Sequence, residues 1–544
     1  MKHILYLLLP VFLFSCTPSE KEEASLLLFN AKIYTVDETF STAEAMVIKD
    51  GKIHELGNSR KLMDKYNFKE RFDAGGRFIY PGFIDPHCHF YGFGKNLFRV
   101  DVSATNSFEE VIERINAWHK EHPDKWIVGR GWDQNTWPEK VYPDKRKLDE
   151  FFPDIPVILQ RIDGHAVIAN SEALRIAGIT ASTKIPGGMV ETFPGTNETS
   201  GILIDNAADV MLAKVPAISL SQQAEALILA QKKCFEVGLT TVSDAGLDRN
   251  IIELIDSLQK AEQLQMRVYA MISAFPENLD YYLSKGPSKT DLLNVCSFKF
   301  YGDGSLGSRG ALMLEPFTDK PGHYGLMINE PGFYREYAQK LYDKGFQMNT
   351  HCIGDSAVRM MLNIYGEVLK TVNDKRWRIE HAQVVHPNDV ALFAKYTVVP
   401  SMQATHATSD MYWAEERLGP ERIKNAYALK TLMKQNGFIV NGSDFPVESI
   451  NPLYGFYAAV ARKDLKGFPE AGFQMENALS REEALKAMTI WAALSNFEEH
   501  EKGSIEVGKF ADFVILEKDI MTVEISEIPN IKTIATYING RKVY

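Results

Sequence analysis

The stretch PGFIDPHCH, residues 81–89, is a short apolar run that ends in two histidines, His87 and His89. In a β-strand, residues i and i+2 point to the same side of the sheet, so both imidazoles can reach one ion at the strand end. A single His-x-His pair is equally compatible with two structural histidines. Its meaning therefore depends on what stands at the ends of the other apolar runs.

Three later residues with metal-binding side chains stand near the ends of their own apolar runs. His351 lies in QMNTHCIGD, His381 in RIEHAQ and Asp444 in IVNGSDFP. Imidazole nitrogens and carboxylate oxygens suit borderline and hard divalent metals, and a catalytic ion keeps one position open for water. Together with the first pair, these residues predict a divalent metal site assembled from several strand ends.

The middle of the chain alternates short apolar runs with helical patterns, for example from Ile127 and Pro156 to Gly437. This alternation predicts parallel strands and an α/β fold. The metal-binding residues fall at the C-terminal ends of these runs, where a (β/α)8 TIM barrel carries its active site. No fixed-length repeat is visible, which disfavours a solenoid.

Short β-type runs flank this middle part on both sides. Asp50-Gly51 near the start and Asn539-Gly540 near the end are strong signals for tight hairpin turns. Ser480-x-x-Glu483 has the pattern of a capping box at the start of a helix. The two ends of the chain are thus expected to be two half-sheets around an α/β core.

The first residues have the composition of an export signal. Residues 4–14 (ILYLLLPVFLF) are apolar but shorter than the roughly 20 residues of a membrane-spanning helix. Ser15-Cys16 follows directly, which resembles the lipobox of bacterial lipoproteins, with Cys16 as the lipidation site. Because Thr17 and not Asp follows, the resemblance favours the outer membrane. The alternative is an ordinary secretory signal whose cysteine falls there by chance.

The overall composition is that of a soluble globular protein rather than a disordered one. Of 544 residues, 45% are hydrophobic and 24% charged, and the formal net charge is −11. An acidic chain argues against nucleic acid as a partner, because phosphate backbones require a basic face. Five cysteines are too few for a disulfide scaffold in a chain of this length.

Further motifs extend the pattern over almost the whole chain. They are DGHAVIAN at Asp163, KFYGDGSLGSRGA at Lys299, HCIGD at His351, GSDFPV at Gly442 and GSIEVGKFADFVIL at Gly503. With PGFIDPHCH and RIEHAQ, and in this order, the chain resembles the amidohydrolase superfamily. More narrowly, it is similar to the YtcJ-like branch, to which N-substituted formamide deformylase belongs.

The resemblance implies a (β/α)8 barrel with a small β-sandwich built from the N- and C-terminal segments. The expected division is a signal peptide (1–16), a tether (17–25), the first part of the sandwich (26–80), the barrel (81–498) and the second part of the sandwich (499–544). The barrel is expected to carry a long insertion at about 90–230.

The resemblance also implies a ligand set for one or two divalent ions, with zinc as the expected metal. The metal-site residues carried over are His87, His89, Lys299, His351, His381 and Asp444. An ammonium group has no lone pair and cannot bind a cation. In related members a lysine at this strand end is carboxylated by CO₂, and we hypothesise a carboxylated Lys299. Asp444 is the expected general base and proton shuttle, and together with Lys299 it forms the catalytic set.

The implied activity is hydrolysis of a non-peptide carbon–nitrogen bond, an N-acyl or N-formyl amide, by metal-activated water. One alternative is a deaminase or cyclic-amide hydrolase, because the metal site alone does not choose the leaving group. Another is a non-catalytic exported binding lipoprotein. The expected partners are a small-molecule amide, the membrane through Cys16 and, in a homo-oligomer, further copies of the chain.

GDGSLG, residues 302–307, matches G-x-G-x-x-G and offers a nicotinamide-binding oxidoreductase as an alternative. Pro316, Pro321 and Gly322 soon after it disrupt the long helix that should receive the pyrophosphate, so a glycine-rich loop is expected instead. Four side chains are candidates for substrate contact: Asp303, Arg309, His165 and His406. Arg309 would suit a carboxylate or carbonyl oxygen.

Overall fold

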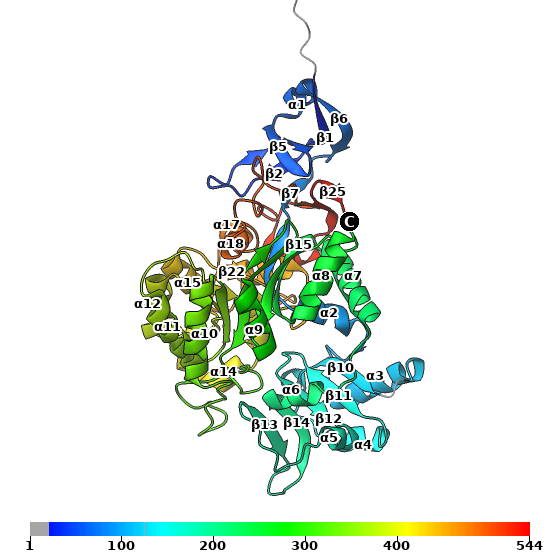
Figure 1. Ribbon diagram of the computed structural model, residues 1–544, viewed down its shortest axis with the longest axis vertical. Helices are drawn as coiled ribbons and strands as arrows, with labels where there is room; N and C mark the ends of the chain where they lie inside the picture. Colours follow the sequence, from blue (N-terminus) through cyan, green and yellow to red (C-terminus); the bar gives the residue numbers. More distant parts are fainter. Residues whose placement is uncertain (1–20, 124–125) are drawn as a thin grey trace, which may run out of the picture.

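The computed structural model describes residues 21–123 and 126–544, and it has three parts arranged along its long axis (Figure 1). A small β-sandwich lies at one end, a barrel in the middle and an inserted domain at the other end. The expected signal peptide, Cys16 and residues 17–20 of the expected tether lie outside the described residues. Across the two described ranges, no helix is long and apolar enough to cross a membrane.

Eight parallel strands form the nearly closed barrel that the strand–helix alternation predicts. They are hydrogen-bonded in the order β8-β15-β16-β18-β19-β20-β21-β22. Their bounds are β8 Phe83–Cys88, β15 Leu239–Leu247, β16 Arg267–Ser273, β18 Leu293–Tyr301, β19 Gln347–Cys352, β20 Arg378–His381, β21 Val399–Met402 and β22 Val440–Asn441. Beyond β22, the Asp444 N–H donates to the His87 carbonyl at 2.8 Å and links the last strand to the first. The (β/α)8 prediction is confirmed.

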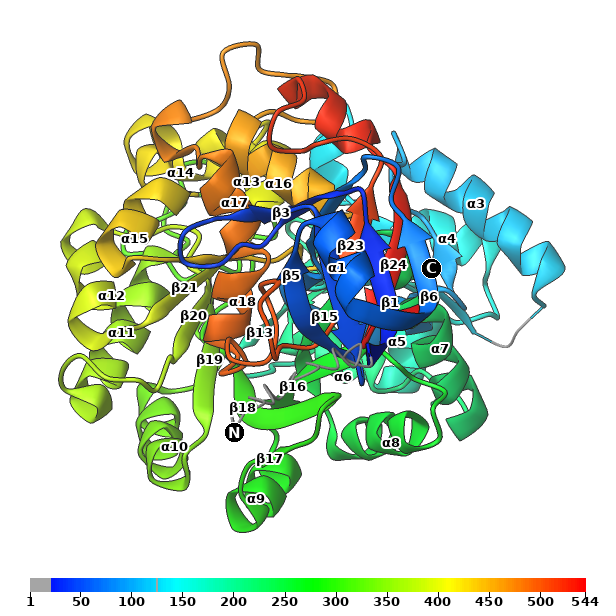
Figure 2. The same cartoon turned by 90° about the horizontal axis from the view of Figure 1, so that it is seen from above.

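Amphipathic helices cover the outside of the barrel (Figure 2). In α8, for example, Ile251, Ile252 and Ile255 are buried on one face, while the opposite face carries charged residues. The covering helices include α7 Leu220–Glu236, α8 Arg249–Lys260, α9 Pro276–Lys285, α10 Pro331–Lys344, α11 Asp355–Leu369, α12 Val390–Tyr396, α15 Leu429–Asn436 and α16 Pro452–Ala461. Burial of these apolar faces holds the strand ends, and so the site, in place.

Two sheets form the β-sandwich, and the second contains strands from both ends of the chain. The first has the order β5-β4-β1-β6 and the second β25-β24-β23-β7-β2-β3. Their bounds are β1 Glu22–Phe29, β2 Lys32–Tyr34, β3 Thr42–Ala43, β4 Ala45–Lys49, β5 Lys52–Gly57, β6 Tyr66–Asp73, β7 Phe78–Pro81, β23 Phe513–Leu516, β24 Thr533–Ile538 and β25 Arg541–Lys542. Ile79 in β7 pairs with Ile515 in β23, so the two ends of the chain share one sheet.

The sandwich begins earlier than the sequence division placed it. Glu22 and Glu23 pair with Tyr66 and Asn67 of β6 in a parallel ladder, so 22–25 belong to β1 and not to the expected tether of 17–25. The two glutamates are exposed at the start of β1, so their charged side chains remain in water.

The inserted domain is a separate α/β unit with its own core. Its sheet has the order β13-β14-β12-β11-β10-β9, with bounds β9 Val100–Asp101, β10 Ile127–Trp132, β11 Val157–Arg161, β12 Ala166–Ala169, β13 Gly188–Thr192 and β14 Thr199–Asp205. Its helices are α3 Phe108–Glu121, α4 Arg146–Phe151, α5 Ser171–Ala177 and α6 Asn206–Leu212. The runs that start near Ile127 and Pro156 therefore form strands of this sheet rather than of the barrel.

The insertion is narrower than the expected range of about 90–230. The helix α2 (Phe90–Asn96) and α7 pack against each other beside the barrel: a Cβ on Gly94 would lie 2.3 Å from the Ala226 carbonyl oxygen. Such a close helix contact requires glycine. The inserted domain proper therefore runs from β9 to α6.

Candidate active site

Three of the expected metal residues meet at the C-terminal end of the barrel strands. One donor atom from each of His87, His381 and Asp444 lies within 4.8 Å of the other two, and all three residues are buried. Asp444 Oδ1 and His381 Nδ1 have no hydrogen-bond partner in the described structure. Unpaired polar atoms are costly in a protein interior, and coordination of an ion would satisfy them. The residues present therefore fit a divalent metal.

The other expected metal residues surround this cluster at different distances. His89 Nε2 lies 3.1 Å from Asp444 Oδ1, and Lys299 Nζ lies 3.1 Å from His87 Nε2. His351 is set further to one side: its ring centroid is 4.5 Å from that of His381, and its Nε2 is 3.4 Å from the Gly304 carbonyl oxygen. The structure thus brings all six residues to one region, with His351 on its rim.

The electrostatic surroundings keep the donor atoms ready to bind a cation. Burial lowers the pKa of His87 and lowers the pKa of His351 and His381 well below the usual range, and neighbouring positive charges add to the effect. Burial would raise the pKa of Asp444, but the adjacent His406 and His89 side chains hold it well below its ordinary value. Neutral imidazoles and a carboxylate are the protonation states that ligate divalent metals.

Glu380 is a site residue that the sequence reasoning did not single out. Its Oε2 accepts a hydrogen bond from His87 Nδ1 at 2.5 Å, and both side chains are fully buried. This contact leaves His87 Nε2 facing the cluster. Regular strand alternation would point Glu380 away from its neighbour His381. However, His381 has a φ of 72°, so the pleat ends there and both side chains reach His87.

Asp85 ties the first barrel strand to the loop that carries Asp444. Its carboxylate accepts hydrogen bonds from Ser443 Oγ at 2.6 Å and from the His87 N–H at 3.1 Å. Burial raises the pKa of Asp85 to about 7, against these hydrogen bonds. A Cβ on Gly442 would lie 2.9 Å from Asp85 Oδ1, so glycine is needed for the close approach. Asp85 therefore holds the His87 backbone close to the loop that carries Asp444.

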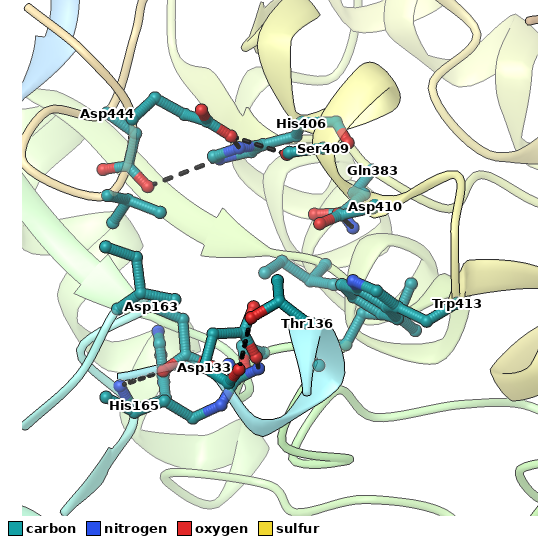
Figure 3. Close-up of a pocket in the computed structure, with 18 of the residues that line it drawn as sticks. Asp133, Thr136, Asp163, His165, Gln383, His406, Ser409, Asp410, Trp413 and Asp444 are labelled. Carbon is teal, nitrogen blue, oxygen red and sulfur yellow. Dashed lines mark hydrogen bonds and ion pairs between the residues drawn. The ribbon is translucent and has the colours of Figure 1, made fainter. Parts of the chain in front are cut away.

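A cavity of ≈ 260 Å³ opens beside the cluster, and Figure 3 shows residues on two facing walls. The barrel wall carries His351, His381, Gln383, His406, Ser409, Asp410, Trp413, Asp444 and Glu448. The inserted-domain wall carries Asp133, Thr136, Arg161, Asp163 and His165. The space is that of a small molecule, and both domains border it.

Two of the four substrate-contact candidates, His165 and His406, line this cavity. Asp303 and Arg309 do not, which corrects the expectation for both. The Asp303 carboxylate accepts backbone N–H bonds from Leu312, Ile353 and Gly354 at 2.8, 3.0 and 2.7 Å. Arg309 Nη2 pairs with Asp319 at 2.8 Å. Asp303 thus ties the loop after β18 to the segment after β19, and Arg309 is paired within its own loop.

That same loop excludes a dinucleotide site at the glycine motif. No helix occurs between β18 and α10, which begins at Pro331. A pyrophosphate would need the N-terminus of a helix directly after the motif. The expectation of a glycine-rich loop is confirmed.

Comparisons with known proteins agree with this geometry. The chain is 33% identical to Protein LONG AFTER FAR-RED 3 of Arabidopsis thaliana, over 97% of this chain and 93% of that protein. It is 31% identical to the putative amidohydrolase YtcJ of Bacillus subtilis (94% and 98%) and 25% identical to N-substituted formamide deformylase of Arthrobacter pascens (95% and 97%).

Among solved structures, an uncharacterized metal-dependent hydrolase from Pyrococcus horikoshii superposes with a TM-score of 0.75 at 26% identity, covering 92% of this chain and 99% of that one. The model of the amidohydrolase family matches residues 70–544. A nearly closed barrel, a buried His/Asp cluster at its strand ends and these likenesses lead to one conclusion. The chain belongs to the amidohydrolase family, in its YtcJ-like branch, and is a metal-dependent hydrolase.

Proposed function

We propose that this protein hydrolyses the carbon–nitrogen bond of a small non-peptide amide, an N-acyl or N-formyl compound. The observation that carries the proposal is the buried His87, His381 and Asp444 cluster, whose donor atoms lie within 4.8 Å of one another beside a small-molecule cavity. The similarity to N-substituted formamide deformylase supports an amide as the substrate class. Zinc is the proposed metal, because nitrogen ligands with one carboxylate suit it.

Asp444 is the proposed proton carrier of the reaction. Its Oδ1 has no hydrogen-bond partner and lies among the proposed ligands, while His406 Nε2 lies 3.5 Å from its Oδ2. From this position Asp444 accepts a proton from the attacking water and delivers it to the leaving nitrogen. A divalent ion bound at the cluster would supply Lewis-acid activation of the water and of the amide carbonyl.

His406 holds Asp444 in that position. Its Nδ1 lies 3.2 Å from Glu448 Oε1, and the same oxygen accepts a hydrogen bond from Ser409 Oγ at 2.6 Å. With both ring nitrogens in contact with carboxylates, the ring has little freedom to turn. His406 therefore orients Asp444 and also borders the substrate space.

Lys299 is proposed to be carboxylated. Its side chain is buried, and burial lowers the pKa of its ammonium group, which favours the neutral amine. The amine nitrogen would form a bond to the carbon of CO₂ and release one proton, which leaves an anionic carbamate beside His87. Protein loaded with ¹³C-bicarbonate should show a carbamate carbon signal that Lys299→Met lacks. A high-resolution crystal structure with unmodified Lys299 turned away from the cluster would contradict the proposal.

Metal analysis and a substrate panel test the proposed function. Purified protein from metal-replete expression is expected to hold about one or two equivalents of zinc, iron or manganese. Less than about a tenth of an equivalent would contradict the proposal that the protein is a metal-dependent enzyme. The panel contains N-substituted formamides, N-acyl amides and cyclic imides. Release of an amine with a carboxylic acid supports the proposal. Ammonia alone indicates a deaminase, and no turnover with tight binding indicates a binding protein.

We also propose that the chain is exported and held in the cell envelope by a lipid on Cys16, in the outer membrane. This proposal rests on the signal-like residues 4–14 and the cysteine that follows them. In a bacterial host, an alkyne-labelled fatty acid should be incorporated into the wild-type protein and not into Cys16→Ser. Equal labelling of both proteins would contradict lipidation at this residue.

A further inference from the structure

Two residues of the inserted domain form a reciprocal pair at the edge of the cavity. His165 Nδ1 lies 2.8 Å from Asp205 Oδ1, and the Asp205 backbone N–H donates to the His165 carbonyl, also at 2.8 Å. The Asp205 side chain is 1% exposed and that of His165 is 18% exposed. The first contact fixes the direction of the imidazole ring, and the second holds the two backbones together. Only its Nε2 is then left for a molecule in the cavity.

The ring lies opposite the metal cluster, as Figure 3 shows for His165 and Asp444. Its centroid is 5.0 Å from that of His351. The His165 backbone N–H donates to Asp163 Oδ1 at 3.1 Å, and Asp163 Oδ2 accepts from Ser305 Oγ at 2.5 Å. Ser305 belongs to the barrel, so the segment that carries His165 is held by both domains.

The glycine-rich loop of the barrel is shaped to receive this pair. A Cβ on Gly304 or on Gly310 would lie 2.4 Å from Asp205 Oδ2, closer than real Cβ atoms come. A Cβ on Gly307 would lie 3.0 Å from Arg161 Nη1. The glycines of this motif thus stand where charged side chains of the inserted domain meet the barrel.

Asp205 itself shows backbone strain and an unpaired atom. Its φ is 52° and its ψ −126°, a conformation that a residue with a side chain rarely adopts. Its buried Oδ2 has no hydrogen-bond partner in the described structure. Strain of this kind persists where the surroundings impose it, and it is concentrated at functional sites.

From this geometry we propose that the inserted domain completes the active site. His165, held by Asp205, forms a hydrogen bond through Nε2 with the amide group of the bound substrate, and loop 302–310 is the socket that seats the pair. This inference rests on the proposed amide substrate. A polar group held rigidly against the reacting amide orients it for attack. His165 is then a catalytic residue and Asp205 a positioning residue.

The test measures a contact and not turnover. The full-length, metal-loaded protein is titrated calorimetrically with acetohydroxamate, a metal chelator that carries an amide-like carbonyl group. We expect about tenfold weaker binding for His165→Gln and for Asp205→Asn, the effect of losing one well-placed hydrogen bond. Metal content should be unchanged, because neither residue belongs to the metal cluster. His122→Gln and Asp154→Asn, exposed residues of the same domain, should bind like the wild type.

Wild-type affinity in both His165→Gln and Asp205→Asn would overturn the proposal, as would a wild-type protein that does not bind the probe. A fall in thermal midpoint with unchanged affinity would also overturn it, because the pair would then be only structural. The variants can bind the probe more weakly, as expected, while the wild type hydrolyses no amide. In that case the proposed function is wrong, but the proposed role of His165 and Asp205 in binding is supported. The two failures are therefore distinguishable.

Two glycine substitutions test whether loop 302–310 seats Asp205. In Gly304→Ala the new methyl group must displace Asp205, so the affinity should fall about as far as in Asp205→Asn. Gly332→Ala is the matched control, since a Cβ there meets nothing within 4 Å. If folded Gly304→Ala protein binds acetohydroxamate like the wild type, the loop is not a socket for the pair.

Discussion

His351 of the barrel and His165 of the inserted domain lie next to each other at the cavity, with ring centroids 5.0 Å apart, and their surroundings shift their pKa values in opposite directions. Burial and the nearby charge of His165 lower the pKa of His351 well below its usual range. Burial would lower the pKa of His165 too, but its hydrogen bond to Asp205 and the nearby carboxylates raise it to about 9. The barrel histidine is thus neutral, and the histidine of the inserted domain is positively charged.

The difference shows that the two domains contribute different chemical groups to the site. The barrel wall supplies neutral nitrogens and a carboxylate, which suit a metal cation. The inserted-domain wall surrounds its histidine with carboxylates, which suits a hydrogen-bond donor. Substitution of one side chain at a time separates these contributions.

The largest effect is expected from Asp444→Asn on the barrel wall. Amide nitrogen and oxygen cannot accept and release a proton as a carboxylate does, so turnover should fall by about 10³-fold or more while the fold is retained. Amine release gives the rate, and thermal unfolding checks the fold. Wild-type turnover in this variant would remove Asp444 from the mechanism and leave the barrel wall without its proton carrier.

The next effect is expected from Glu380→Gln, behind the same wall. Loss of the carboxylate that orients His87 should weaken metal affinity by about 10–100-fold. Competition with a chelator gives the affinity, and Glu421→Gln, an exposed glutamate of the barrel, is the matched control. Equal affinities in the two variants would mean that His87 needs no partner to face the ion.

The pH dependence of His165 tests the other wall. Because its folded pKa of about 9 exceeds the ordinary 6.5, the His165–Asp205 pair stabilises the fold fully below about pH 6.5. That contribution is lost as the pH rises through about 9. The difference in thermal midpoint between wild type and His165→Gln should therefore be larger at about pH 6 than at about pH 9.5. A difference that grows with pH would show that His165 is neutral in the folded protein.

The smallest effect is expected from Arg309→Gln, which lies outside the cavity lining. Arg309 pairs with Asp319 and does not line the cavity, so kcat/KM should change by less than about twofold. Amine release under identical conditions measures it. A large loss would show that Arg309 leaves Asp319 and contacts the substrate.

Much of the fold could be predicted because its signals are local. The hairpins at Asp50-Gly51 and Asn539-Gly540 form with all four residues at positive φ, as such turns require. Ser480 and Glu483 form the predicted capping box. The barrel strands were visible as apolar runs, but the strands from Ile127 and Val157 have the same pattern in the inserted domain. Apolar runs reveal strands, not the sheet to which each strand belongs.

The candidate site was partly predictable for the same reason. His87, His381 and Asp444 stand at strand ends, and parallel strands bring their carboxyl ends to one edge whatever the loops do. Glu380 was hidden because strand alternation points it away from His381, and only the positive φ of His381 reverses that. Arg309 looked like a substrate contact until the folded loop gave it Asp319.

The sequence by itself therefore determined the barrel, the turns and the strand-end positions of His87, His381 and Asp444, since each depends on residue spacing or on backbone preferences over a few neighbours. Only the tertiary structure decided which wall each histidine faces, that Asp205 holds His165 and that the glycine-rich loop seats them. These relations join residues far apart in the sequence, within the inserted domain for His165 and Asp205 and between the two domains for Asp205 and the loop. A pKa or a hydrogen bond depends on the distance in space between groups, which no local pattern in the sequence records.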